Sequence, residues 1–206
     1  MPDLAQITGA LAAEAHAQPS PTDERIIDGA LAEVAAHGIK HATVDGIAAR
    51  AGVGRVTVFR RFGSKDALIE RLTARELRRF LIEIDTTLRQ FEDPEDQVVE
   101  AFAACLRAGR EHPFVARVVR TEPGAALEQL AAGSPSPIDV GRAFVSGWIS
   151  SRGGRGRVVR NADQIADALV RMAAFYVLFP PATIDSRDED AVRDLARTAL
   201  APLVRD

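Results

Sequence analysis

The sequence predicts an all-α fold, with an N-terminal three-helix domain joined by one long helix to a C-terminal helical bundle. Three observations indicate this class. Apolar residues recur at helical spacings of three and four along most of the chain. Long alternating strand patterns and Asn-Gly hairpin signals are lacking. Pro- and Gly-containing turn signals divide the sequence into segments of helical length.

The first helix is predicted to begin at Ser20. Serine is a good N-cap, Pro21 suits the first helical position, and Asp23 is an acid in the first turn. Gly38 is expected to end the helix, because glycine readily adopts the backbone conformation found after a helix terminus. The Ala-rich residues 1–19, which lack Lys and Arg, are expected to form a mobile lead.

Two short helices follow, with a tight turn between them. Thr43 is a candidate N-cap for the second helix, and Gly52 is expected to close it. The third helix is predicted from about Gly54 to Phe62. This is the pattern of a helix-turn-helix unit, whose last helix enters the major groove of DNA. We expect Phe59 and Phe62 to pack that helix against the first two and its arginines to face outward.

A long fourth helix is predicted from Lys65 to about Gln90, after Ser64 as its N-cap. It would span roughly 40 Å, more than one small bundle needs, and therefore joins two regions. We place the domain boundary within its first turn, giving domains 20–66 and 67–206. Turn signals define the remaining helices, which are expected at 95–111, 113–121, 123–132, 137–151, 162–179 and 188–204.

Charge is distributed unevenly along the 206 residues. The formal net charge is −3, so the molecule as a whole is not a nonspecific binder of nucleic acid. Between Gly38 and Lys65, however, six Lys and Arg side chains accompany a single acid, Asp45. Alone, this cluster is more typical of a solvated face. Combined with the helix-turn-helix pattern, it predicts contacts with DNA phosphates.

The cellular compartment of the protein is predicted from features that the sequence lacks. The single cysteine, Cys105, excludes a disulfide framework and favours a reducing compartment. Residues 1–19 carry acids where a signal peptide needs positive charge, and no stretch approaches the roughly 20 apolar residues of a membrane span. We therefore expect a cytoplasmic protein.

Enzymatic and metal chemistry are not expected. Cys105 and His112 share a predicted helix face, but seven residues of helical rise separate them by roughly 10 Å, too far for a nucleophile–base hydrogen bond. Cys105 is better interpreted as a small buried apolar residue. His37 and His41 are interrupted by Gly38, which disfavours a metal site. The sequence contains no phosphate-binding glycine loop or nucleophile elbow, so neither an enzyme activity nor a cofactor is expected.

Residues 43–72, TVDGIAARAGVGRVTVFRRFGSKDALIERL, resemble the DNA-binding domain of the TetR family of bacterial transcriptional regulators. The resemblance covers about residues 20–70, and the remaining chain matches only in length and helical character. It implies that Thr43, Thr57 and Lys65 contact phosphates. The full set of expected DNA-binding residues is Thr43, Arg55, Val56, Thr57, Phe59, Arg60, Arg61 and Lys65.

Several positions depart from the family pattern. Phe59 stands where tyrosine is usual, so the packing is kept but a phosphate hydrogen bond is lost. Gly54 replaces a common serine, which weakens the cap of the third helix. Gly46 replaces a common aspartate, which removes half of a capping box. Val56 occupies a position where a small residue or proline is frequent.

The resemblance further implies a small-molecule pocket among the C-terminal helices, although large apolar side chains there are equally those of an ordinary core. Trp148 and Tyr176 are favoured because each combines apolar surface with a polar group. The candidate pocket residues are Phe102, Cys105, Leu106, Phe114, Val118, Phe144, Trp148, Met172, Phe175 and Tyr176.

The resemblance also implies a homodimer through the last two helices, arranged as a four-helix interface. The apolar stripe of each of these helices exceeds what one small bundle must bury. The two stripes are Ile165, Leu169, Met172, Ala173 and Tyr176, then Val192, Leu195, Ala196, Ala199 and Leu203.

The expected function is that of a repressor released from a pseudo-palindromic operator by a small molecule. One alternative is a ligand-independent dimeric regulator whose C-terminal domain only dimerises or binds a protein partner. Another is a helical enzyme or interaction module with an incidental basic patch. Residues 152–160, RGGRGRVVR, resemble RNA-binding segments in composition, but their place between helical segments favours a loop.

Overall fold

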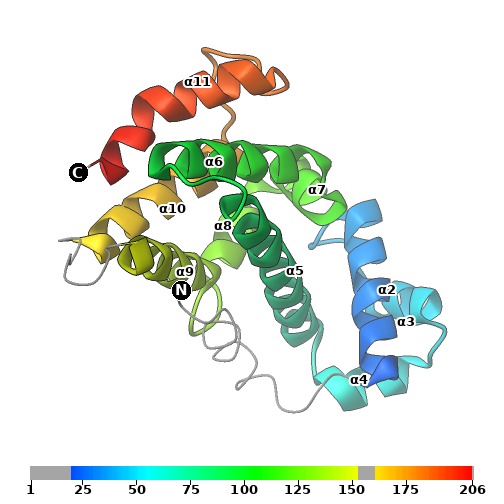
Figure 1. Ribbon diagram of the computed structural model, residues 1–206. Helices are drawn as coiled ribbons and strands as arrows, with labels where there is room; N and C mark the ends of the chain where they lie inside the picture. The colour runs from blue at the N-terminus through cyan, green and yellow to red at the C-terminus, as the bar shows by residue number, and fades with distance from the viewer. Residues whose placement is uncertain (1–19, 153–160, 206) are drawn as a thin grey trace.

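The computed structural model describes residues 20–152 and 161–205, in which helices joined by loops and turns are present and no strand occurs (Figure 1). The predicted lead at 1–19 and most of the Gly/Arg-rich loop lie outside the described residues. The helices are α2 (Pro21–His37), α3 (Val44–Ala51), α4 (Arg55–Phe62), α5 (Lys65–Leu88), α6 (Pro94–Glu111), α7 (Pro113–Thr121), α8 (Pro123–Ala131), α9 (Pro137–Arg152), α10 (Ala162–Leu178) and α11 (Glu189–Ala199), followed by a 3₁₀ turn at Ala201–Val204.

The predicted helix starts of the N-terminal domain are confirmed by their hydrogen bonds. Ser20 Oγ accepts from the Asp23 backbone N–H at 3.3 Å, while the Ser20 N–H donates to the Asp23 carboxylate at 3.0 Å. Thr43 Oγ1 accepts from the Gly46 N–H at 3.0 Å. Gly52 closes α3 with φ of +64°, a left-handed conformation that glycine adopts without steric cost.

The end of the chain differs from the prediction of one helix over 188–204. The α-helix stops at Ala199, and residues 201–204 form a 3₁₀ turn instead. Proline at position 202 explains the break, because it has no N–H to bond the carbonyl one turn earlier. The Leu203 N–H bonds the Leu200 carbonyl at 3.0 Å, as a 3₁₀ turn requires.

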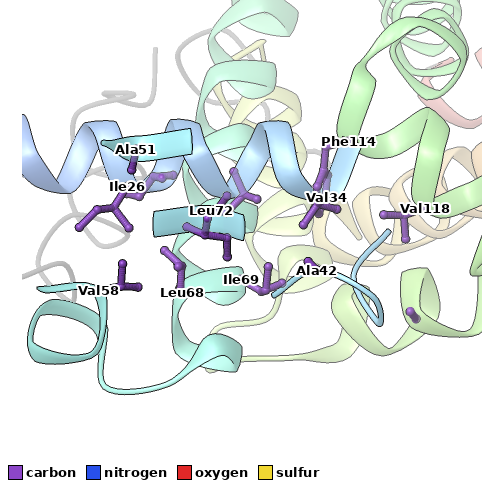
Figure 2. Packing of buried hydrophobic residues seen from close by; sticks show 14 of the residues in the cluster. Ile26, Val34, Ala42, Ala51, Val58, Leu68, Ile69, Leu72, Phe114 and Val118 are labelled. Atoms are coloured by element: carbon purple, nitrogen blue, oxygen red, sulfur yellow. The ribbon is translucent and has the colours of Figure 1, made fainter. Parts of the chain in front are cut away.

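One hydrophobic cluster connects the N-terminal three-helix unit to the rest of the molecule. Ile26 and Val34 of α2 are fully buried in it beside Leu72 of α5. The same cluster contains Phe114 and Val118 of α7, and Figure 2 shows Phe114 beside Val34. α7 packs directly on α2, so close-packed side chains join the N-terminal unit to the C-terminal helices.

A second cluster forms where α6, α10 and α11 meet, and α11 lies along α6 (Figure 1). Val192 and Ala196 of α11 are 1% and 0% exposed there, packed with Val99 and Phe102 of α6. Two residues of the expected interface stripe of the last helix, Val192 and Ala196, are thus buried inside the chain, whereas Leu203 of the same stripe is 37% exposed. The sequence stripe identified a buried face but did not indicate which surface covers it.

Within residues 20–152 and 161–205, no helix has both the length and the apolar character needed to cross a membrane.

Candidate nucleic-acid interface and adjoining cavity

The orientation of α4 is set by two i, i+4 pairs on opposite sides of the helix. Val58, 2% exposed, is its buried residue, and Phe62 packs on the same core. Phe59 is 39% exposed and lies on the outer side, where the Arg55 guanidinium carbon is 5.4 Å from its ring centroid. The expectation that Phe59 holds α4 down is therefore wrong. Val58 does so, because residues four apart share a helix face.

The outward face of α4 carries cationic and apolar side chains together. Arg55, Val56 and Arg60 are exposed, Val56 to 77%. Arg55 forms an ion pair with Asp45 of α3 at 2.9 Å, but both side chains are largely solvent-accessible. Thr57 is half-buried and Thr43 is exposed at the start of α3. Exposed cationic and apolar side chains on one helix face are the groups with which a helix can contact base edges and phosphates in a major groove.

Besides Arg55, two more of the expected DNA-contacting cations have partners within the fold. The Arg61 guanidinium bonds both carboxylate oxygens of Asp23, at 2.9 and 3.1 Å, and so ties α4 to the start of α2. The Lys65 ammonium donates to three main-chain carbonyls, those of Ile39, Lys40 and Ala42. In the part of the chain that is described, the Arg60 side chain makes neither a hydrogen bond nor an ion pair, so its charge is available to a ligand.

Glu33 of α2 replaces the capping residue that is missing at position 46. Its Oε1 accepts from the Thr43 backbone N–H at 3.4 Å, and its Oε2 accepts from Arg50 Nε at 2.8 Å. Burial alone raises the pKa of Glu33, but the bonds from Arg50 and Thr43 and the nearby charges of His37 and Arg50 outweigh it and hold the pKa below its ordinary value. A buried carboxylate therefore stabilises the start of α3.

A cavity of about 580 Å³ lies next to this head, enclosed by α5–α10. Its walls are almost entirely hydrocarbon, which is typical of small-molecule sites. Six of the ten predicted pocket residues lie in this wall, namely Phe102, Cys105, Phe114, Val118, Phe144 and Trp148. Four others lie elsewhere. Leu106, Met172 and Tyr176 belong to the core around α6 and α10, and Phe175 is 60% exposed on the surface.

Of the two favoured residues, Trp148 lines the cavity but its indole N–H is already hydrogen-bonded, and Tyr176 lies outside the cavity. The Trp148 indole N–H donates to Gln97 Oε1 at 3.2 Å. The Tyr176 ring packs edge-on against Phe102, with ring centroids 5.4 Å apart. The sequence analysis missed the part of the wall formed by α5, including Leu77, Phe80 and Leu81. The apolar stripe of α5 was visible in the sequence, but nothing in it indicated a cavity rather than a packed surface.

Cys105 faces this apolar environment as a protonated thiol. Burial raises the pKa of Cys105 to about 12. A thiol with such a pKa contains essentially no thiolate at neutral pH and is a poor nucleophile. Among the described residues, no group of three or more His, Cys, Asp and Glu side chains is arranged to hold a metal ion.

A polar cluster connects the cavity wall to the head. Glu76 of α5 lines the cavity, accepts from Arg75 Nε at 2.8 Å and lies 3.2 Å from His112 Nε2. Arg75 is buried and also bonds Asp28 at 2.7 Å and Glu24 at 3.1 Å, both on α2. One guanidinium thus joins a residue of the cavity wall to the first helix of the head.

A second contact links the same two regions at the other end of α2. The Lys40 backbone N–H donates to Glu122 Oε2 at 3.1 Å, and Glu122 lies between α7 and α8. Gly38 makes room for it, because a Cβ there would overlap the Glu122 carboxylate. The head is therefore held to the C-terminal helices at both ends of α2.

Comparisons with known proteins agree with the architecture. Residues 26–72 match the family described as "Bacterial regulatory proteins, tetR family". No curated protein sequence is similar enough to count as a match. Among solved structures, the repressor AlkX from Dietzia sp. strain DQ12-45-1b superposes with a TM-score of 0.68 at 18% identity, over 91% of this chain and 97% of that one.

Two further structures are similar over their full lengths. FadR from Bacillus halodurans, described as a fatty acid degradation regulator, gives a TM-score of 0.63 at 19% identity, covering 89% of this chain and 98% of its own. GusR from Salmonella enterica gives a TM-score of 0.64 at 19% identity, and the match covers 92% of this chain and 98% of GusR. At these identities the likeness shows a shared fold across both the head and the C-terminal helices.

Proposed function

We propose that the chain is a DNA-binding regulator of the TetR family, whose model matches residues 26–72, and that it is a cytoplasmic repressor which a small molecule releases from a pseudo-palindromic operator. In this proposal, the domain of residues 20–66 binds DNA, and the domain of residues 67–206 binds the effector and dimerises. The observation that carries the proposal is the outward face of α4, where Arg55, Val56 and Arg60 are exposed beside the half-exposed ring of Phe59.

We assign the DNA contacts from the exposure of each side chain and from the partners that it already has within the fold. Arg60 has no partner among the described residues and is assigned the principal base or phosphate contact. Arg55 can exchange its exposed bond with Asp45 for one to DNA, since surface ion pairs contribute little. The Val56 side chain is suited to a thymine methyl group. Thr43 and Thr57 are placed at the flanking phosphates, whereas Arg61 and Lys65 support the geometry of the head.

A homodimer would place two such heads on one operator. α9 and α10 pack side by side, and the end of α10 exposes Phe175 together with Phe179, the residue directly after the helix; their ring centroids are 4.8 Å apart. Exposed aromatic pairs of this kind mark association surfaces. We therefore assign the four-helix interface to α9 and α10 of each copy, in place of α10 and α11. The two α4 helices would then enter successive major grooves, roughly 34 Å apart.

Release by a small molecule is supported by the position of the cavity. Its wall includes α5, which begins immediately after α4, and α7, which packs on α2. A ligand that expands the cavity displaces both helices and alters the spacing of the two heads. It acts only through its different affinity for the two spacings. AlkX, described as a repressor, has this arrangement of helices.

The test is selection of bound duplexes from a random pool with the full-length protein. A two-fold symmetric consensus is expected, together with a sedimentation coefficient of a dimer in free solution. Replacement of both exposed phenylalanines, Phe175→Ser with Phe179→Ser, is expected to give a folded monomer with weakened operator binding. Recovery of no enriched duplex at low ionic strength contradicts DNA regulation. Enrichment that no small molecule reverses favours the ligand-independent alternative.

A further inference from the structure

The cavity wall contains few charged groups, and they are mostly acidic. Its ionisable residues are Glu76, Arg79 and Glu83 of α5, with His112 and the protonated Cys105. The other polar side chains in the wall are Thr73 and Gln129, and these bond each other at 3.1 Å.

Both carboxylate oxygens of Glu76 have partners within the fold. Its Oε1 accepts from Arg75 and from Arg79, and its Oε2 lies 3.2 Å from His112 Nε2. Burial alone raises the pKa of Glu76, but the bonds from His112 and Arg75 and the charges of Arg75 and Arg79 outweigh it and lower the pKa. The Glu76 carboxylate at the corner of the cavity near the head is therefore negative and already bonded, whereas Nδ1 of the neighbouring His112 is buried without a hydrogen-bond partner.

No described cation is free to meet a negative ligand in the cavity. Arg79 is the lining arginine, and its half-exposed side chain bonds Glu76. Arg75 lies behind the wall and is held by three acids. Arg117 of α7 has a buried Nε without a hydrogen-bond partner, but it is not part of the lining. A buried carboxylate without a cationic partner is strongly unfavourable.

We propose that the cavity binds an uncharged, predominantly hydrocarbon effector and rejects a carboxylate of the same chain length. The apolar wall gains free energy by covering hydrocarbon, whereas a carboxylate meets Glu76 and Glu83 and finds no free cation. This inference rests on the proposed function, because it names the chemical class of the small molecule that acts through this cavity.

Trp148 provides a direct readout, since it lines the cavity and is the only tryptophan in the chain. Its fluorescence is titrated with decan-1-ol, decanoate and decyltrimethylammonium, each below its micelle-forming concentration. Decan-1-ol is expected to bind at least about tenfold more tightly than decanoate, a difference of about 1.4 kcal/mol. A smaller ratio, or tighter binding of the ammonium than of the alcohol, overturns the proposal.

Two variants and a matched control test where the selectivity arises. Gln129→Lys adds a cation to the wall and is expected to shift the preference toward decanoate by at least about tenfold. Gln164→Lys adds the same charge on the exposed surface of α10 and is expected to leave the ratio unchanged. Ala174→Phe narrows the cavity and is expected to weaken binding of decan-1-ol, with thermal unfolding monitored to verify that the variant folds.

Different results would refute different proposals. If decanoate binds best while operator release still occurs, the charge selectivity is wrong and small-molecule control stands. If none of the three probes changes the fluorescence or the operator affinity, both this inference and control through the cavity are overturned. DNA binding itself is tested separately by the duplex selection.

Discussion

The carboxylate of Glu33 occupies the space that a side chain at Gly46 would need, because a Cβ built on Gly46 overlaps it. The two positions are therefore coupled across α2 and α3. The family pattern places aspartate at position 46 to cap α3 from within, and this chain caps α3 from α2 with Glu33. The departure noted in the sequence is a relocated capping acid rather than a missing one.

Gly46→Ala is expected to destabilise the protein by about 1–3 kcal/mol, since the added methyl must displace a buried, hydrogen-bonded carboxylate. Urea unfolding measures the difference. Gly54→Ala is the matched control, because a Cβ there meets nothing within 4 Å. In a Glu33→Ala background the penalty at position 46 should largely disappear. An equal penalty in both backgrounds would show that the two positions are not coupled.

The ionised state of Glu33 makes the head sensitive to acid. Its pKa in the folded protein is lowered from an ordinary value of 4.5, so its stabilisation is fully present above that pH and is lost as the pH falls through the folded pKa. Glu33→Gln should thus be less stable than the parent at pH 7, and the gap should narrow below about pH 4.5. The urea unfolding midpoints of the parent and of Glu33→Gln at pH 7 and at about pH 3.5 measure this difference in stability. Glu70→Gln, which replaces an exposed acid, is the control. A gap that does not change with pH contradicts this role.

Arg60 and Lys65 should separate in their effects, although both were expected to contact DNA. Arg60→Ala removes an unpartnered charge and should lower the slope of log affinity against log salt by about one, with little change in stability. Lys65→Ala removes donors to three carbonyls and should cost about 1–3 kcal/mol of unfolding free energy. Operator titrations from low to moderate salt, paired with urea unfolding, distinguish the two. If Lys65→Ala is stable but shows a reduced salt slope, the result favours the original prediction that Lys65 contacts a phosphate.

Phe59→Tyr should tighten operator binding by about 0.5–1.5 kcal/mol, because a hydroxyl on this half-exposed ring can bond a phosphate. The ring packs beneath Arg55 and not in the core, so the substitution does not disturb the fold. Phe62→Tyr provides the comparison, since that ring packs toward the core and should give no gain. Unchanged or weaker affinity of Phe59→Tyr in an operator titration would refute the contact.

The helices and the head were predictable because their determinants are local. Capping residues and glycine turns lie within a few residues of the boundaries they set, as at Ser20 and Gly52. The replacement of a capping residue at 46 by Glu33 was not predictable, because it depends on how α2 crosses α3. The same holds for Lys65, whose carbonyl partners lie more than twenty residues away. Sequence patterns indicate that a side chain is cationic but not whether the fold already uses its charge.

The cavity shows the same division between local and long-range information. Six of ten expected lining residues are in its wall because large apolar side chains of adjoining helices converge there. Phe175 satisfied the same criterion and lies on the surface. Hydrophobicity indicates burial without indicating whether a core, a cavity or another subunit provides it.

The contact from Arg75 to Asp28 and Glu24 should carry the signal between effector and operator, since Arg75 is also bound to Glu76 in the cavity wall. Replacing Arg75 itself would remove a partner of the buried Glu76 carboxylate as well as the bonds to α2, so its effect on stability and its effect on coupling could not be separated. The double variant Asp28→Asn and Glu24→Gln removes only the partners on α2, which are partly exposed, so the loss of stability should stay near 1 kcal/mol or less. Operator affinity is then measured without and with saturating decan-1-ol. The parent should show a large loss on adding the alcohol, and the double variant a severalfold smaller one, because α2 no longer follows α5. Glu70→Gln, an exposed acid on α5, is the control. An undiminished effect of the alcohol in the double variant would place the coupling in the packing of α7 on α2 instead.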